Sequence, residues 1–207
     1  MHFEFSADDA EAKRLVRYEF DIAEKALKRY ERVGGVTLIT AINQLRYAGR
    51  HIIDADADDI TEKTRAEHYR KALNHCRRAA FDAREATAVY LLDKIQDFFE
   101  QSKTCDIDHI TRFIPDYSDW LNKAAKAQKL LVTVGSLREV PDQTEIESAI
   151  TDLLDFHSQI RVKWGSINSV QAKADRKERL ETRRFIINFL LAVIGIIISI
   201  IIGIISL

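Results

Sequence analysis

The sequence predicts an all-α protein, a bundle of long helices followed by a single C-terminal transmembrane helix. Three observations support this fold class. The 207-residue chain contains only two prolines and seven glycines, and few helix breakers favour long helices. No segment alternates convincingly between polar and apolar residues with the period of a strand. Residues 185–207 contain no charged side chain, and a stretch of that length is sufficient to cross a bilayer as a helix.

Apolar residues at steps of three and four predict the first three helices. The first begins near Ser6, an N-terminal capping residue, and ends at Gly34 and Gly35. The second covers about 38–53 and stops at an acidic turn over 54–59. The third extends from about Thr61 to Phe99 with no breaker.

Residues 105–114 are predicted to be a connector. Pro115 suits the first turn of a fourth helix, which ends near Gly135. Pro141 and Thr144 open a fifth helix. We therefore expect three regions: a helical body over 1–140, a connecting helix over 141–184 and a membrane helix over 185–207.

The fifth helix carries a stripe with the heptad spacing of a coiled coil, namely Ile146, Ile150, Leu153, His157, Ile160, Trp164 and Ile167. Two interpretations are open. The stripe faces the core of its own chain, or it mediates self-association, in which case Ile150, Leu153, Ile160 and Trp164 join the copies.

Small or polar residues follow one face of the predicted membrane helix: Asn188, Ala192, Gly195, Ser199, Gly203 and Ser206. Small residues let membrane helices pack closely. This face therefore indicates an oligomeric bundle, in which Asn188 and Ser199 line a narrow path. The alternative is a plain anchor whose glycines have no role in association.

Basic residues precede the apolar segment and predict its orientation. They are Arg176, Lys177, Arg179, Arg183 and Arg184. Lysine and arginine beside a membrane span stay on the cytoplasmic side. The N-terminal residues 1–5 do not have the pattern of a secretory signal. We expect a single-pass protein with a cytoplasmic body and an outward C-terminus.

A second basic group lies on the third helix, where Arg70, Arg77 and Arg84 are seven residues apart. Its other members are Lys71, Asn74 and Arg78, with the rings of Tyr69 and Phe81 nearby. Arginine binds phosphate through two parallel hydrogen bonds, and rings stack on bases. This group predicts a site for a nucleotide or a single-stranded nucleic acid. The alternative is a solvated face paired with Glu67, Asp82 and Glu85.

Two segments have an arginine followed five residues later by a histidine: Arg46 with His51, and Arg70 with His75. This spacing resembles the Arg-x4-6-His motif of the bacterial HEPN nucleases, where two copies meet across a dimer to cleave RNA. The chain departs from that motif, because Tyr47 and Lys71 occupy the position after each arginine, where a polar residue is usual.

Cysteine and histidine spacing indicates no metal site and no cofactor. Cys76 and Cys105 are the only cysteines, so reduced structural thiols are expected. The histidines at 51, 68, 109 and 157 share no spacing typical of zinc ligands.

The layout of a helical body and a C-terminal membrane helix resembles the small membrane effectors of bacterial anti-phage systems. In size and layout it is most similar to the membrane effector of the Hailong system. The stretch over 69–83 is also similar to helical modules of bacterial defence proteins. The resemblance implies an inner-membrane channel gated by a ligand that a companion nucleotidyltransferase makes. It also implies membrane depolarisation, growth arrest and abortive infection.

We therefore expect a non-enzymatic, homo-oligomeric membrane effector, such as a tetramer, whose partners are its own copies, the lipid bilayer and a nucleotide-like ligand. Two alternatives stay open. One is a membrane-tethered RNase that uses Arg46 with His51 or Arg70 with His75. The other is a tail-anchored adaptor without pore activity.

Overall fold

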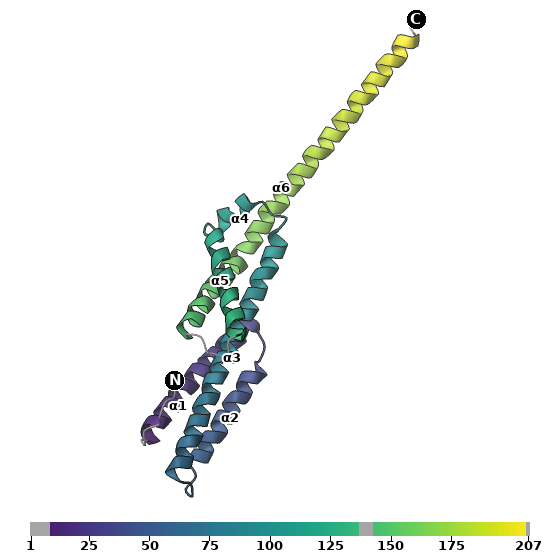
Figure 1. Cartoon of the computed structure of the whole chain (residues 1–207). Coiled ribbons are helices and arrows are strands. Elements are labelled where there is room, and N and C mark those ends of the chain that lie inside the picture. Colours follow the sequence, from purple (N-terminus) through teal and green to yellow (C-terminus); the bar gives the residue numbers. More distant parts are fainter. Residues whose placement is uncertain (1–8, 137–142, 206–207) are drawn as a thin grey trace. The chain divides into compact units, whose positions relative to one another are not determined.

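The computed structural model describes the backbone of residues 9–136 and 143–205, and side chains over 9–133 and 144–190. Six helices account for nearly all of this part, and no strand occurs in it. They are α1 (Asp9–Gly34), α2 (Ile39–Ala55), α3 (Glu62–Ser102), α4 (Ile107–Phe113), α5 (Tyr117–Ser136) and α6 (Gln143–Ile205) (Figure 1). The prediction of an all-α helical bundle is confirmed.

Local signals explain where the helices begin and end. Gly35 ends α1 with a φ of 68°, in the left-handed region that glycine adopts without strain. The Thr61 hydroxyl accepts a hydrogen bond from the Thr64 N–H, 3.2 Å away, at the start of α3. The Asp106 side chain accepts from the Asp108 N–H at 3.0 Å and caps α4, a helix that the sequence analysis assigned to a connector.

The chain forms two compact units. The first comprises Met1–Glu100 and Ser118–Ser158, and the second comprises Gln101–Tyr117 and Gln159–Leu207. Their bounds differ from the three regions expected from the sequence, because α3 and α6 each contribute residues to both units. This division follows contacts between helices, whereas the expected regions followed changes in composition.

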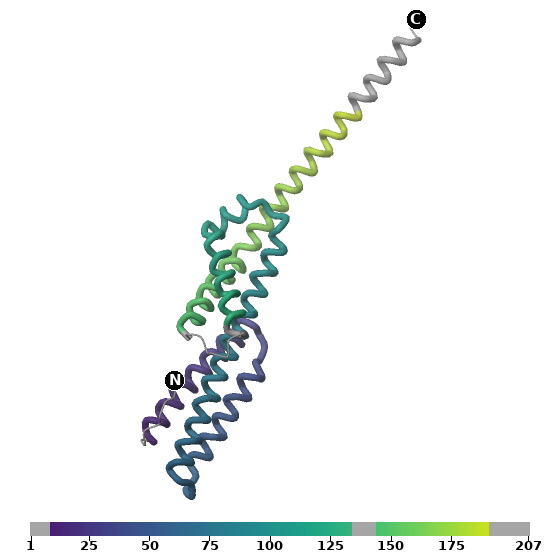
Figure 2. Tube along the Cα trace, in the orientation of Figure 1, coloured from purple at the N-terminus to yellow at the C-terminus, as the bar shows by residue number. Residues whose placement is uncertain are grey.

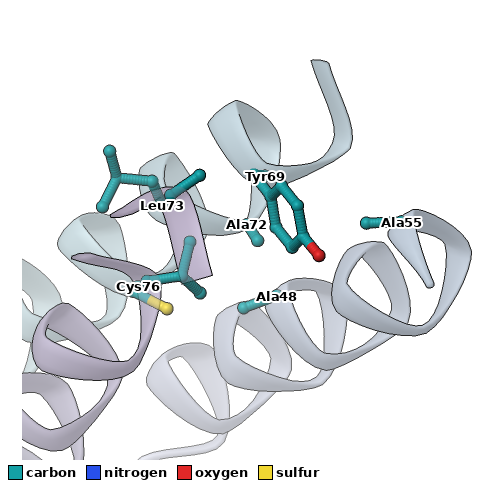
Figure 3. Close-up of a cluster of buried hydrophobic side chains, with 8 residues drawn as sticks. Ala48, Ala55, Tyr69, Ala72, Leu73 and Cys76 are labelled. Carbon is teal, nitrogen blue, oxygen red and sulfur yellow. The ribbon is translucent and has the colours of Figure 1, made fainter. Parts of the chain in front are cut away.

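Within the first unit, α1, α2 and α3 pack as an up-down-up bundle, which can be followed along the trace in Figure 2. Small side chains dominate its core. Ala48 and Ala55 of α2 point toward Tyr69 and Ala72 of α3 (Figure 3), and all four are almost fully buried. Alanine at the contact lets helix backbones approach closely, so α2 and α3 form a tight hairpin.

Aromatic rings hold α3, α5 and α6 together in the same unit. Trp120 of α5 stacks on Phe156 of α6, with ring centroids 5.4 Å apart and planes 6° from parallel. Phe98 and Phe99 of α3 contact the same Phe156 ring, at 6.4 and 6.1 Å. Rings in such arrangements contribute about 0.5–1.5 kcal/mol per pair beyond the area they bury.

In the second unit, α4 packs beside α6 through polar and apolar contacts. Gln171 of α6 accepts a hydrogen bond from the Asp106 N–H at 3.3 Å, and its side-chain oxygen lies 3.2 Å from Nδ1 of His109. Ile110, Ile114 and Ile167 are buried in this unit.

Within the residues that the structure describes, no helix has a stretch long and apolar enough to cross a bilayer. Helix α6 continues through the uncharged C-terminal stretch as far as Ile205.

Candidate functional site

Three histidines meet on the α2–α3 hairpin and form the most distinctive polar group of the first unit. The Nδ1 atoms of His51 and His68 are 3.2 Å apart. The His51 ring also stacks on the His75 ring, with centroids 5.4 Å apart and planes 15° from parallel. His75 Nδ1 lies 2.7 Å from Oε1 of Gln44. We call His51, His68 and His75 the histidine cluster.

The carboxylate of Asp54 lies close to two members of this cluster. One ligand-type atom from each of His51, Asp54 and His68 lies within 4.8 Å of the others, and all three residues are half-buried. Arg50 donates to Asp54 from Nε at 3.2 Å and forms an ion pair at 2.9 Å. Two imidazoles and one carboxylate are ligand types that divalent transition metals accept.

Histidine spacing along the chain predicted no metal site. His51 and His68 are 17 residues apart and lie on two different helices, so no helical period connects them. Only the antiparallel pairing of α2 and α3 brings the rings together. A signal was nevertheless present, since three of the six histidines fall within 25 residues around one predicted turn.

Burial lowers the pKa of His51 below its usual range, and the nearby His75, His68 and Lys71 act in the same direction. The Asp54 carboxylate opposes this shift but does not outweigh it. The neutral imidazole, the form that binds a metal, is therefore favoured at neutral pH.

Tyr69, predicted to stack on a base, is 1% exposed. Its ring is part of the α2–α3 core, and its hydroxyl donates to Oδ1 of Asp56 at 3.1 Å. The ring is therefore not presented at the surface as the spacing suggested, because its helical position faces α2. A hollow of about 370 Å³ adjoins it, lined by Lys13, Val16, Arg17, Phe20, Ile52, Asp56 and Tyr69.

Two of the predicted phosphate ligands, Arg77 and Arg84, are paired with carboxylates from other helices. Arg77 donates from Nε to Glu19 of α1 at 3.1 Å. Arg84 is 7% exposed and pairs with Glu147 of α6. Arg29 of α1 donates to the same carboxylate through two hydrogen bonds of 2.7 and 3.1 Å. The contacts of Arg77 and Arg84 therefore join helices of the first unit.

Burial raises the pKa of Glu147, but hydrogen bonds from Arg29 and Arg84 outweigh this effect and hold it below the usual value for glutamate. Glu147 is thus charged at neutral pH and links α6 to both α1 and α3. Glu147 could not be identified from helical spacing, because its partners are 118 and 63 positions away.

The other predicted ligand residues lie at or near the surface of α3. Arg70 donates to Glu67 at 2.8 and 2.6 Å, and these bonds are the main reason why the pKa of Glu67 falls to about 2. Lys71 pairs with the same carboxylate at 3.6 Å. Asn74 is exposed, between these two residues and Arg78 along the helix.

Arg78 pairs with Asp82 at 2.8 Å, and its guanidinium lies 5.4 Å from the centroid of the Phe81 ring. Pairing with Glu67 and Asp82 agrees with the alternative interpretation of a solvated, charge-paired face. The exposed basic residues that carry the phosphate-binding prediction are accordingly Arg70, Lys71 and Arg78.

The two Arg-x4-His segments meet through their histidines, since His51 and His75 stack. Their arginines have other partners. Arg46 donates to the side chain of Asn43 at 3.1 Å, and Arg70 donates to Glu67. The structure therefore brings together the two histidines of the RNase alternative within one chain.

Three of the four residues assigned to self-association are buried in the single chain. Ile150 is 0% exposed, Leu153 1% and Ile160 7%, while Trp164 is half-buried. This burial supports the first interpretation of the heptad stripe, in which it faces the core of its own chain.

Of the residues assigned to pore lining or helix packing, Asn188 is exposed. The side chains of Ala192, Gly195, Ser199 and Gly203 lie outside the described residues.

No protein-family model, curated protein or solved structure matches this chain.

Proposed function

We propose that this chain is a membrane effector, anchored through residues 185–207, with its helical body on the cytoplasmic side. One observation carries the proposal. At the start of the uncharged stretch, Phe185, Ile186, Ile187, Phe189 and Leu190 are all exposed, between 49 and 71%. Successive helical residues point about 100° apart, so these five side chains cover more than half of the circumference of α6, and the uncharged Asn188 lies on the remaining side. An uncharged helix with so wide an exposed apolar surface is suited to hydrocarbon.

The charges before this stretch support the orientation. Arg179, Arg183 and Arg184 are exposed within one to two turns of Phe185. Basic residues in that position stay on the cytoplasmic side and bind anionic headgroups, at roughly 1 kcal/mol each. The body would therefore face the cytoplasm of a bacterium and the C-terminus would point outward.

The effector would be a homo-oligomer that assembles through its tails. Buried Ile150, Leu153 and Ile160 are occupied by the chain's own core, so the membrane helix is the better candidate for association. Asn188 and the small residues at 192, 195, 199 and 203 would supply the contact face. Such a bundle would open a path for ions, depolarise the membrane and arrest growth during phage infection.

A ligand with phosphate groups would act on the body through the exposed part of α3. Arg70, Lys71 and Arg78 are about half exposed, with side-chain exposures of 49, 46 and 61%. Because each already pairs with a carboxylate, a nucleotide or single-stranded nucleic acid would have to displace Glu67 or Asp82. Such a ligand would be the product of a companion nucleotidyltransferase.

Membrane fractionation with a voltage-sensitive dye tests the anchor and the channel together. Arginines at Val193 and Ile197, near the middle of the uncharged stretch, each disfavour insertion by roughly 2.5–3.5 kcal/mol. The double-arginine variant should leave the membrane fraction and lose depolarisation, while the control with leucine at both positions should keep both properties. A native chain that stays in the soluble fraction would refute the proposal. Membrane location without depolarisation would favour the adaptor.

The stacking of His51 on His75 favours one second candidate, a membrane-tethered RNase. Each ring belongs to one Arg-x4-His segment, and the two rings lie 5.4 Å apart. Under the nuclease alternative, His51→Ala with His75→Ala should abolish toxicity and RNA degradation. Under the channel proposal, the same variant should still depolarise the membrane. His109→Ala, outside the cluster, serves as the control.

A further inference from the structure

We propose that His51, His68 and Asp54 form a binding site for a divalent transition-metal ion of the zinc type. This site lies on the α2–α3 hairpin and does not depend on membrane insertion or on the ligand proposed for α3.

The distance between the two ring nitrogens fits a shared metal. Zinc binds imidazole nitrogen at about 2.0–2.1 Å in tetrahedral geometry, which places two such nitrogens roughly 3.4 Å apart. The Nδ1 atoms of His51 and His68 are 3.2 Å apart. A bound ion therefore requires only a small adjustment of either ring.

Asp54 supplies the third ligand. It lies three residues after His51 on α2, so both side chains project from the same face. A carboxylate oxygen lies within 4.8 Å of one ring nitrogen of each histidine. Although Arg50 donates to Asp54, each carboxylate oxygen has a second lone pair for a metal. The ion would thus be held by two residues of α2 and one of α3.

The surroundings support the ligand assignment. His75 stacks on the His51 ring at 5.4 Å and so fixes its plane, while His75 is itself held by Gln44. Outer residues that orient a metal-binding imidazole strengthen the site. Two imidazoles and one carboxylate leave one tetrahedral position for water, which is the pattern of an open zinc site.

Metal binding would couple the site to the stability of the hairpin. Because the ligands come from both helices, the ion binds the folded hairpin and not the separated helices. At free Zn²⁺ of about 100 times the Kd, the ratio of folded to unfolded chain should rise about 100-fold.

The test uses the tag-free full chain in detergent, stripped with EDTA and titrated with Zn²⁺ against a fluorescent chelator. One equivalent of Zn²⁺ should bind per chain, and Co²⁺ in its place should give the visible bands of tetrahedral coordination. His51→Ala, His68→Ala and Asp54→Ala should each weaken binding by more than about 100-fold, since the loss of an outer-shell partner alone has an effect of about 10- to 100-fold.

Two controls separate ligands from neighbours. His109→Ala should leave Zn²⁺ binding unchanged. His75→Ala should keep one Zn²⁺ bound per chain with affinity lowered by about 10- to 100-fold, because His75 orients the His51 ring without binding the ion. Circular dichroism shows whether each variant is folded, and Asp54→Asn provides a milder substitution if His51→Ala unfolds. Absence of stoichiometric Zn²⁺, or unchanged binding by the folded His68→Ala and Asp54→Asn variants, would overturn the proposal. Complete loss in His75→Ala would overturn the ligand assignment.

Discussion

Substitution of Glu147 by glutamine should destabilise the first unit more than any neighbouring surface change. The carboxylate accepts two hydrogen bonds from Arg29 and one from Arg84. Arg84 is the most enclosed partner, with a side-chain exposure of 9%, against 28% for Arg29 and 32% for Glu147. Glutamine keeps the shape of the side chain but removes its charge, so the poorly solvated Arg84 guanidinium loses its carboxylate partner Glu147.

Breaking a fully buried ion pair by removing one partner costs about 3–5 kcal/mol. Because Glu147 and Arg29 are partly accessible to water, we expect a smaller loss of about 2 kcal/mol in the free energy of unfolding. For a chain of this length, a loss of 1 kcal/mol in the free energy of unfolding lowers the melting temperature by about 2–4 °C. The melting temperature should therefore fall by about 4–8 °C.

The assay is a thermal melt of the full chain in detergent at neutral pH, followed by circular dichroism. Glu145→Gln is the matched control, because Glu145 is exposed two residues earlier on the same helix and should change stability by less than about 0.5 kcal/mol. If both variants melted at the same temperature, the hydrogen bonds of Glu147 with Arg29 and Arg84 would contribute nothing measurable to stability, which would contradict the prediction.

The dependence on pH gives a second check of the same contact. The pKa of Glu147 is lower in the folded chain than its ordinary value of 4.5, so its contribution is complete above that value and disappears as the pH falls through the folded pKa. The difference in the free energy of unfolding between the native chain and Glu147→Gln should stay constant at about pH 6–8 and become smaller below about pH 4.5.

Three further substitutions or measurements address the α1–α3 bundle. Ala72→Leu, at a fully buried contact, should destabilise by about 1–3 kcal/mol through overpacking, whereas Ala125→Leu on the exposed face of α5 should be nearly neutral in the same melt. Gly35→Ala, where φ is 68°, should destabilise the folded chain by about 1–2 kcal/mol. Gly49→Ala, with open space around a new Cβ, should stabilise it by roughly 0.5–1 kcal/mol. Equal melting temperatures of the two variants would contradict both statements. Burial raises the pKa of the Cys76 thiol to about 12, so mass spectrometry after alkylation at pH 8 should find its peptide unmodified until denaturant is added.

The helices of this protein could be predicted because their boundary signals are local. Gly35 ends α1, and the breaker-free stretch after Thr61 forms α3, each within a few residues of the expected position. Helix α4 was missed, since its seven residues are too few to display a helical period. Its capping residue, Asp106, was the available signal.

The candidate sites depend on which helices pack together, and spacing within one helix does not contain that information. Arg77 and Arg84 fall on one side of α3 as expected, yet their charges are matched by Glu19 on α1 and Glu147 on α6. Pairing of Arg78 with Asp82 within α3 could be predicted, because it follows the four-residue period. The histidine cluster was partly predictable, because the predicted turn over 54–59 joins the two helices that carry its residues.

Alanine at the α2–α3 contact has a consequence for how the hairpin is aligned. Ala48 and Ala55 present no large ridge to α3, so their packing alone does little to prevent one helix from sliding along the other. Alignment is then determined near the turn, where Arg65 donates to the Ala55 carbonyl at 3.0 Å and Tyr69 to Asp56 at 3.1 Å. Those two polar contacts, made by residues within five positions of His51 or His68 in the sequence, thereby decide whether His51 and His68 face one another.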